Sequence, residues 1–262
     1  MVVVDTHCHA SPVWFQPVET LLSEMNMAGV DKALLVQIRG EYDNSYLVEC
    51  MRRFPGRFSV VAIIDTDRPN APEVLEGWLR QGCEGLRLTP STRSPGRDPL
   101  AIWRKAAQLG IAISCGGSLA EFASPQFESL FREFPNMPII IEHLGGGGAD
   151  RSEGWAEYKK VLRLAQYPNA YMKVPGLGEL CPRPMPMIQP DPFPNVPPLI
   201  QMALDAFGAN RLMWGSDFPP SAAREGYRNT LRFPMGHVRF KSEADKEWVF
   251  GGTAATLFRF SG

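Results

Sequence analysis

Eight short runs of apolar, β-branched residues alternate along this chain with amphipathic segments, and this alternation constrains the fold more than any other feature. Their near-continuous hydrophobicity is typical of strands buried on both faces, as in a parallel sheet covered by helices. Eight such units predict a (β/α)8 TIM barrel of the α/β class, with an open doubly wound sheet as the alternative. The runs lie at residues 2–4, 33–36, 58–64, 85–88, 111–114, 138–141, 170–174 and 212–214.

The segments between these runs carry apolar residues at helical spacing. Val18, Leu21, Leu22, Met25 and Ala28 follow the i, i+3, i+4, i+7 pattern. Gly29 directly after them is expected to cap the helix C-terminus. The same spacing predicts helices over 100–107, 127–131, 155–165 and 198–207. A length of 262 residues agrees with a single barrel domain over 1–262, because such barrels need about 250 residues.

Charge and composition exclude several classes of function. The chain has 27 Lys and Arg against 28 Asp and Glu, so it lacks the basic excess of a general nucleic-acid binder. No run of about 18 apolar residues is long enough to span a membrane. The first residues lack the basic region of a signal peptide, and the five cysteines are too scattered for a disulfide framework. We therefore expect a cytoplasmic protein whose partner is a small-molecule substrate.

A proline-rich stretch breaks the alternation at residues 175–198, where nine of 24 residues are proline. Helices cannot form through such a stretch. It follows the seventh run, so in a barrel it lies at the C-terminal face, where it is either a lid over the mouth or a rigid surface loop.

Histidines and an aspartate stand where three of the expected strands end. His7 and His9 are two residues apart, so on an extended strand they point to the same side and form half of a divalent metal site. The alternative is a pair of polar histidines with satisfied hydrogen bonds in a turn. His143 follows the sixth run and Asp217 follows the eighth. In a barrel, polar residues at these ends belong to the active site.

Three motifs resemble the amidohydrolase superfamily: Asp5-Thr6-His7-Cys8-His9, His143-Leu144-Gly145-Gly146 and Trp214-Gly215-Ser216-Asp217-Phe218-Pro219. Within it they resemble the second amidohydrolase family, which includes sugar-type lactonases, 2-pyrone-4,6-dicarboxylate lactonase and carboxymuconate-semialdehyde-type decarboxylases. The resemblance implies that His7 and His9 bind a divalent metal, expected to be zinc. It implies that Asp217 binds the metal and acts as general base, and that His143 polarises the substrate or moves a proton.

The sequence departs from this family at the fifth strand. Metal-dependent relatives usually carry a histidine at its end, whereas here Cys115 stands at the expected position. A thiolate is a competent zinc ligand, so Cys115 is a candidate fourth ligand beside His7, His9 and Asp217. The alternative is that Cys115 fills space in the core and the site works without a metal, as the resemblance to the pyrone-dicarboxylate lactonase branch implies.

Three basic residues are candidates for binding an acidic substrate. Arg87 lies on the fourth run, Lys173 on the seventh, and Arg39 follows the second. In a barrel they approach the same mouth, where an arginine fork suits a carboxylate. For Arg87 the alternative is a salt bridge inside the barrel.

Together these features predict a hydrolase that opens a lactone or similar cyclic ester of a small carboxylated molecule by activating water. A cyclic amide or imide is a further hydrolytic substrate class. The alternatives are a non-oxidative decarboxylase using the same residues and a binding barrel without catalysis. Similar barrels often form dimers, so a homodimer is also expected.

Overall fold

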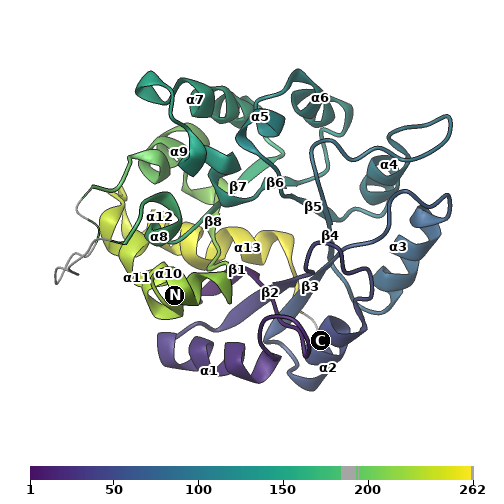
Figure 1. Ribbon diagram of the computed structural model, residues 1–262, viewed down its shortest axis with the longest axis horizontal. Coiled ribbons are helices and arrows are strands. Elements are labelled where there is room, and N and C mark those ends of the chain that lie inside the picture. Colours follow the sequence, from purple (N-terminus) through teal and green to yellow (C-terminus); the bar gives the residue numbers. More distant parts are fainter. Residues whose placement is uncertain (184–192, 194, 261–262) are drawn as a thin grey trace.

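Eight parallel strands form one sheet in sequence order, from β1 to β8 (Figure 1). This computed structural model describes residues 1–183, 193 and 195–260. The strands are β1 (Val4–Cys8), β2 (Lys32–Val36), β3 (Phe58–Ala62), β4 (Gly85–Leu88), β5 (Ala112–Cys115), β6 (Ile139–Ile141), β7 (Ala170–Val174) and β8 (Leu212–Trp214).

The first and last strands meet and close the sheet into a barrel. Thr6 donates a side-chain hydrogen bond of 2.7 Å to the carbonyl of Trp214. Directly beyond β8, the amide of Asp217 donates to the carbonyl of His7 at 2.7 Å. A parallel bridge between Cys8 and Phe218 continues the pairing. The predicted TIM barrel is therefore confirmed, and the open doubly wound sheet is excluded.

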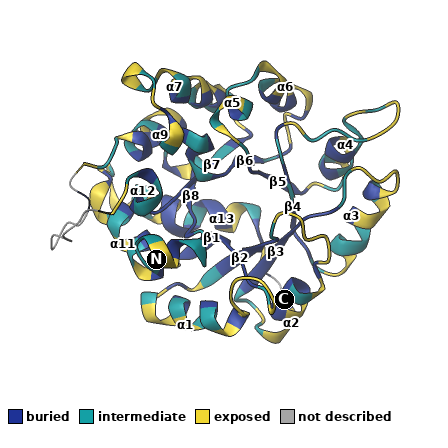
Figure 2. Cartoon of the chain, viewed as in Figure 1, coloured by how far each residue is buried: buried dark blue, intermediate teal, exposed yellow. Residues whose placement is uncertain are grey.

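Helices surround the barrel, and Figure 2 shows their exposed sides facing outward while the strands are buried. The prediction of a helix ending at Gly29 is confirmed, because α1 ends there with a left-handed φ of 75°. The α-helices are α1 (Val18–Ala28), α2 (Ser45–Arg53), α3 (Ala71–Arg80), α4 (Ala101–Gln108), α5 (Leu119–Phe122), α6 (Pro125–Glu133), α7 (Ala156–Leu162), α8 (Leu177–Leu180), α9 (Leu199–Phe207), α10 (Pro220–Arg224), α11 (Tyr227–His237), α12 (Glu243–Glu247) and α13 (Thr253–Leu257).

The sheet has an apolar cluster on each face. On β2, Ala33 and Leu35 belong to the large cluster beneath the helices, whereas Leu34 and Val36 belong to a smaller second cluster. Because successive side chains on a strand point to opposite faces, the smaller cluster fills the barrel interior. Phe258 and Ala254 of the C-terminal segment join it. Burial of these apolar side chains leaves the polar residues of the strand ends to gather at the mouth.

Two boundaries differ from the sequence-based expectation. The first strand extends to Cys8 instead of ending at residue 4, so His7 lies on the strand itself. A short helix, α8, forms inside the proline-rich stretch where none was expected. It fits because residues 176–181 contain no proline. The suggested lid falls largely on residues 184–192 and 194, which lie outside the described residues. Within the described ranges, no helix is both long and apolar enough to cross a membrane.

Candidate active site

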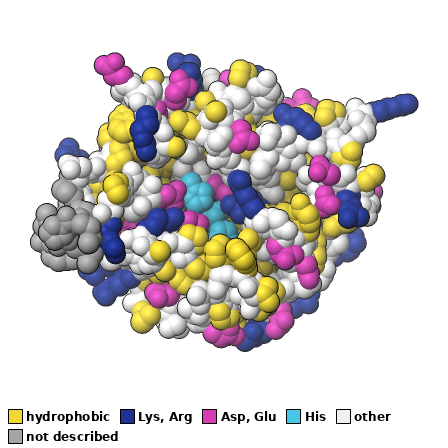
Figure 3. All heavy atoms as spheres, viewed as in Figure 1, with side chains coloured by type: hydrophobic (Ala, Val, Ile, Leu, Met, Phe, Trp, Pro, Cys, Tyr) yellow, Lys and Arg dark blue, Asp and Glu magenta, His cyan; other side chains and the backbone are white. Residues whose placement is uncertain are grey.

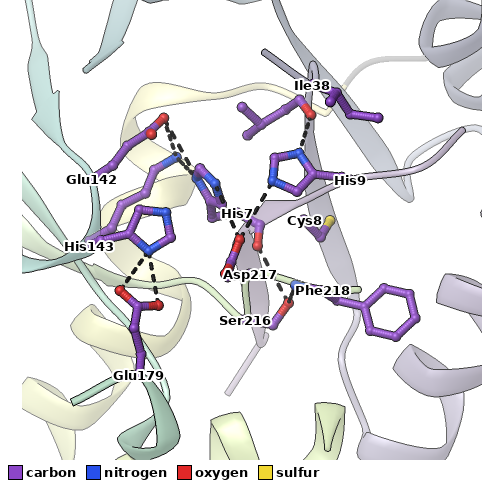
Figure 4. Close-up of polar contacts among 12 residues, drawn as sticks. His7, Cys8, His9, Ile38, Glu142, His143, Glu179, Ser216, Asp217 and Phe218 are labelled. Carbon is purple, nitrogen blue, oxygen red and sulfur yellow. Dashed lines mark hydrogen bonds and ion pairs between the residues drawn. The ribbon is translucent and has the colours of Figure 1, made fainter. Parts of the chain in front are cut away.

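The strand-end histidines and the aspartate converge at the C-terminal mouth of the barrel. His7 Nε2 lies 4.0 Å from Asp217 Oδ1, and His9 Nε2 lies 3.6 Å from the same oxygen. The ring centroids of His7 and His143 are 4.6 Å apart. Figure 3 shows histidine side chains in a central hollow of the molecular surface, and Figure 4 shows the four side chains facing one another. The structure thus brings together residues from three separate strand ends.

The local backbone aims these side chains. His143 and Asp217 have left-handed φ values of 51° and 53°, a conformation that costs a residue with a Cβ about 1–3 kcal/mol. The following Gly145 and Gly146 continue this turn with positive φ, where glycine carries no such cost. Gly215 allows a close approach, since a Cβ there would lie 2.6 Å from the Cβ of His7. Backbone strain at two polar residues that meet at one mouth is typical of a functional site.

Hydrogen bonding fixes the orientation of His9. Its Nδ1 lies 2.7 Å from the carbonyl oxygen of Val36. A carbonyl only accepts, so Nδ1 carries the proton and donates. The other nitrogen, Nε2, faces Asp217. His9 therefore presents a ring nitrogen to the site in the orientation that a metal ligand or hydrogen-bonding group requires.

Asp217 is held as a carboxylate. Burial alone would raise its pKa, but the neighbouring His9, His143 and Arg224 side chains lower the pKa below its ordinary value. Among these, Arg224 donates a hydrogen bond of 2.9 Å to Oδ2. The remaining oxygen, Oδ1, points to the histidines and can accept a proton or contact a cation.

His143 forms an ion pair with Glu179 on α8. Its Nδ1 lies 2.9 Å from Oε1 and 3.1 Å from Oε2 of that carboxylate. Burial opposes charging of the ring, but the carboxylate outweighs it and raises the pKa of His143 above the ordinary value. The ring can therefore carry a second proton on Nε2, away from Glu179 (Figure 4).

A buried ionic cluster lies behind His7. Lys173 Nζ is 3.0 Å from His7 Nδ1, 2.9 Å from Ser114 Oγ and 4.0 Å from Glu142 Oε1. Burial lowers the pKa of Lys173 to about 8, although Glu142 opposes this shift. Burial acts to raise the pKa of Glu142, but the positive charges of Arg87 and Lys173 outweigh it and hold that pKa well below its usual range.

Arg87 belongs to the same cluster. Its Nη2 lies 2.8 Å from Glu142 Oε2, its Nε is 3.1 Å from Oε1, and its Nη1 donates to the carbonyl of Gln37 at 3.1 Å. The alternative of a salt bridge inside the barrel is what the structure contains. The edge of the guanidinium that was expected to bind a substrate carboxylate donates to Glu142 instead.

Arg39 is placed differently, on the exposed rim of the mouth. It lines a cavity of about 220 Å³ together with Tyr42, Thr66, Thr89 and Arg87. A Cβ built at Gly116 would lie 2.6 Å from Arg39 Nη2 and 2.5 Å from Glu142 Oε2. Arg39 therefore extends over the end of β5 toward the ionic cluster.

The structure corrects the placement of Cys115. Its thiol is fully buried in the large cluster beneath the helices, together with Ile113, and burial raises its pKa well above the ordinary value. Ser114 points to the opposite side, where it contacts Lys173 and Glu142. Alternation along β5 therefore directs Cys115 away from His7, His9 and Asp217. The site gains no thiolate ligand from this strand.

The remaining candidate ligands fit a divalent cation by position. One ligand atom from each of His7, His9 and Asp217 lies within 4.8 Å of the others. His7 Nε2 is buried, and none of the described residues forms a hydrogen bond with it. Two imidazoles and a carboxylate are donors typical of a catalytic zinc site with an open position.

Several site residues were not predicted from the sequence. Glu142 could have been found, because it directly precedes His143 at a strand end. Asp5 lies in the first motif and accepts hydrogen bonds from Ser216 Oγ at 2.6 Å and the Ser216 amide at 2.9 Å, which ties the ends of β1 and β8 together. Glu179 and Arg224 carry no sequence signal, because they reach the site from short helices.

Two of the proteins to which this chain is similar in sequence carry the names of lactone-hydrolysing enzymes. The chain is 27% identical over 258 residues to an L-fucono-1,5-lactonase of Burkholderia ambifaria, covering 93% of this chain and 84% of that protein. It is 25% identical over 227 residues to a 4-sulfomuconolactone hydrolase of Rhizobium radiobacter, covering 83% and 70%.

Solved structures share the fold. An amidohydrolase from Burkholderia multivorans with bound zinc superposes with a TM-score of 0.77 at 20% identity, over 98% of this chain and 99% of that one. A putative 2-pyrone-4,6-dicarboxylic acid hydrolase from Pseudomonas putida gives 0.75 at 22% identity, over 99% and 98%. The family model described as amidohydrolase matches residues 4–260, nearly the whole barrel and all four strand-end residues. The chain belongs to the amidohydrolase family.

Proposed function

We propose that this protein opens a lactone or similar cyclic ester of a small carboxylated molecule. The observation that carries the proposal is the placement of an ionised carboxylate, Asp217, opposite a histidine, His143, whose pKa Glu179 raises. Ester hydrolysis needs both a group that takes a proton from water and a group that supplies one to the leaving oxygen. The lactone-hydrolysing relatives support the choice of ester.

The proposed steps use these two groups in turn. Asp217 takes a proton from a water molecule, whose oxygen attacks the carbonyl carbon of the ring. Positive charge from His143 stabilises the oxyanion of the tetrahedral intermediate. When the ring C–O bond breaks, His143 gives its Nε2 proton to the leaving alkoxide. Water has then added across the ester, and proton exchange with solvent restores both groups.

A divalent metal, with zinc as the candidate, would be held by His7, His9 and Asp217. Such an ion, when bound, polarises a carbonyl and lowers the pKa of bound water. The donor set supports this binding position, because His7 Nε2 and His9 Nε2 both face Asp217 Oδ1.

Arg39 is the residue that we propose for the substrate carboxylate. Arg87 and Lys173 already pair with the buried Glu142. They therefore add positive potential to the site, but their charged groups are not free to bind a substrate carboxylate. Arg39 offers an exposed guanidinium beside the cavity of about 220 Å³. The Thr66 and Tyr42 hydroxyls beside it suit the hydroxyl groups of a sugar-derived lactone.

A panel of lactones with and without carboxylates tests the proposal. We expect stoichiometric acid release, measured by pH-stat, without carbon dioxide. Release of carbon dioxide from a carboxylic acid would favour the decarboxylase alternative. Thermal stabilisation by a lactone without any turnover would favour a binding barrel and contradict the proposal. The homodimer and the cytoplasmic location stay predictions.

A further inference from the structure

His7 and His9 lie at the same strand end but differ in the group that contacts the Nδ1 atom of each ring. Behind His9, the Val36 carbonyl accepts a hydrogen bond from Nδ1 at 2.7 Å. Behind His7, the amine of Lys173 lies 3.0 Å from Nδ1. A carbonyl is an acceptor only, and a lysine ammonium is a donor only. The two histidines therefore have opposite hydrogen bonds at the same ring position.

The partners of Lys173 define the direction of its contact with His7. The Ser114 hydroxyl donates a hydrogen bond to Glu142 Oε1 at 2.7 Å, so the lone pairs of its oxygen face Lys173 at 2.9 Å. Lys173 thus donates to Ser114, and its charge faces Glu142 Oε1 at 4.0 Å. One of its two remaining protons is directed at His7, where Nδ1 accepts the hydrogen bond. The ring proton of His7 then resides on Nε2, which faces the centre of the site.

Glu142 is a second candidate partner for the same nitrogen. Its Oε1 lies 3.7 Å from His7 Nδ1, just beyond hydrogen-bond distance. Metal-bound histidines almost always donate their other ring N–H to a carboxylate or a backbone carbonyl. His9 has such a partner already. His7 would gain one only if its Nδ1 donated to Glu142 instead of accepting from Lys173.

We propose that Lys173 is a positioning residue that holds the proton of His7 on Nε2. In this state His7 presents a hydrogen-bond donor to the substrate carbonyl, and the lone pair that a metal requires is not available. To bind a divalent cation through Nε2, His7 must carry its proton on Nδ1. There the N–H donates to Glu142, and the contact with Lys173 is lost. The role toward the carbonyl rests on the proposed lactone hydrolysis, whereas the tautomer and the competition with metal do not.

The tautomer is measured directly in the metal-free wild-type protein. Long-range proton–nitrogen NMR of the imidazole side chains at neutral pH distinguishes Nδ1–H from Nε2–H. We expect His7 as the Nε2–H form and His9 as the Nδ1–H form, so His9 is the internal reference. His7 with its proton on Nδ1 would overturn the proposal, whatever substrate the enzyme uses.

Zinc titration by calorimetry supplies a second readout that needs no turnover. Lys173→Met removes the donor that competes for Nδ1, so Glu142, which still accepts from Ser114 and Arg87, can also accept from Nδ1. We therefore expect zinc to bind about 10–100-fold more tightly. Lys160→Met on α7, where the lysine pairs with Glu157 at the surface, is the matched control and should leave affinity unchanged. Unchanged or weaker binding by Lys173→Met would overturn the proposal. Should that variant fail to fold, the wild-type NMR result decides.

Discussion

Arg224 joins the two groups to which we assign opposite proton-transfer roles, because its Nη2 contacts both Glu179 and Asp217. It lies 3.5 Å from Glu179 Oε2 and 2.9 Å from Asp217 Oδ2. Glu179 in turn binds His143. This chain of charges keeps Asp217 ionised while it favours the protonated form of His143. The pKa values of the base and the acid are thus moved apart by one network.

Replacing Glu179 tests the acid. Glu179→Gln removes the negative charge that raises the pKa of His143, so that pKa should fall. The alkaline limb of kcat/KM, where His143 loses its proton, should move to lower pH. The measurement is a pH–rate profile, with Glu157→Gln at the surface as the control. A profile that keeps its alkaline limb at the wild-type pH would show that His143 is not the group that must be protonated.

Replacing Arg87 should lower the stability of the fold, whereas replacing Arg39 should weaken substrate binding. Arg87→Met leaves the buried Glu142 without its closest charged partner, so we expect a loss of about 3–5 kcal/mol in the free energy of unfolding. Arg39→Met removes an exposed charge and should raise KM about tenfold or more for a carboxylated substrate, with little change in stability. Denaturant unfolding and steady-state kinetics measure the two effects. A loss of stability in Arg39→Met together with a raised KM and normal stability in Arg87→Met would contradict the placement of these residues.

Glu225 should make stability depend on pH. Burial raises its pKa to about 7, and its Oε2 has no hydrogen-bond partner within the part of the chain that the structure describes. The unfolded chain has a pKa near 4.3, so the folded state binds more protons in this window and loses stability as pH rises from about 4.3 through 7. Glu225→Gln keeps an acceptor for the Gly178 amide, which donates to Oε1 at 2.9 Å.

The variant should therefore gain thermal stability relative to wild type as the pH rises, with the largest difference above pH 7. Melting temperatures at pH 5 and pH 8 measure this, and Glu243→Gln, at an exposed position, is the control. A constant difference between Glu225→Gln and wild type across this range would show that the carboxyl titrates as it does in water.

Cys115→Ala should affect the core and leave the site intact. The thiol packs in the large cluster beneath the helices, so its removal should lower the free energy of unfolding by about 1 kcal/mol. Zinc affinity and turnover should stay at wild-type values. Loss of zinc binding in a variant with normal thermal unfolding would restore Cys115 as a ligand.

The contrast between His7 and Cys115 shows what the sequence can predict. Apolar runs mark the buried strands, and polar residues within three positions of the end of a run mark the mouth, so the sequence predicted that His7, His143 and Asp217 lie there. Successive residues of the four-residue strand β5 face the barrel interior and the helices in turn, so a shift of one position changes the side that a residue faces. One position separates Ser114, which faces the site, from Cys115, which faces the helices, and the sequence pattern did not resolve that step.

Side chains that reach the site from short helices beyond the strands could not be predicted from the sequence. Glu179 and Arg224 lie on helices of four and five residues, too short to show a period. Their roles arise only when β7 and β8 bring both helices to the same side of the mouth. Pairing of Arg87 with Glu142 likewise depends on the register across β4, β5 and β6, which determines which charges meet inside the barrel.

The central claim is that Asp217 activates water for ester opening. Asp217→Asn keeps the size of the side chain and removes the base, and loss of a positioned base costs about 10²–10⁴ in rate. The decisive measurement is the kcat of wild type and Asp217→Asn, side by side, on a lactone that the wild type opens, with circular dichroism to verify the fold. We predict a decrease in kcat of at least about 100-fold in a folded variant. A folded Asp217→Asn variant that opens the lactone at the wild-type rate would contradict the account.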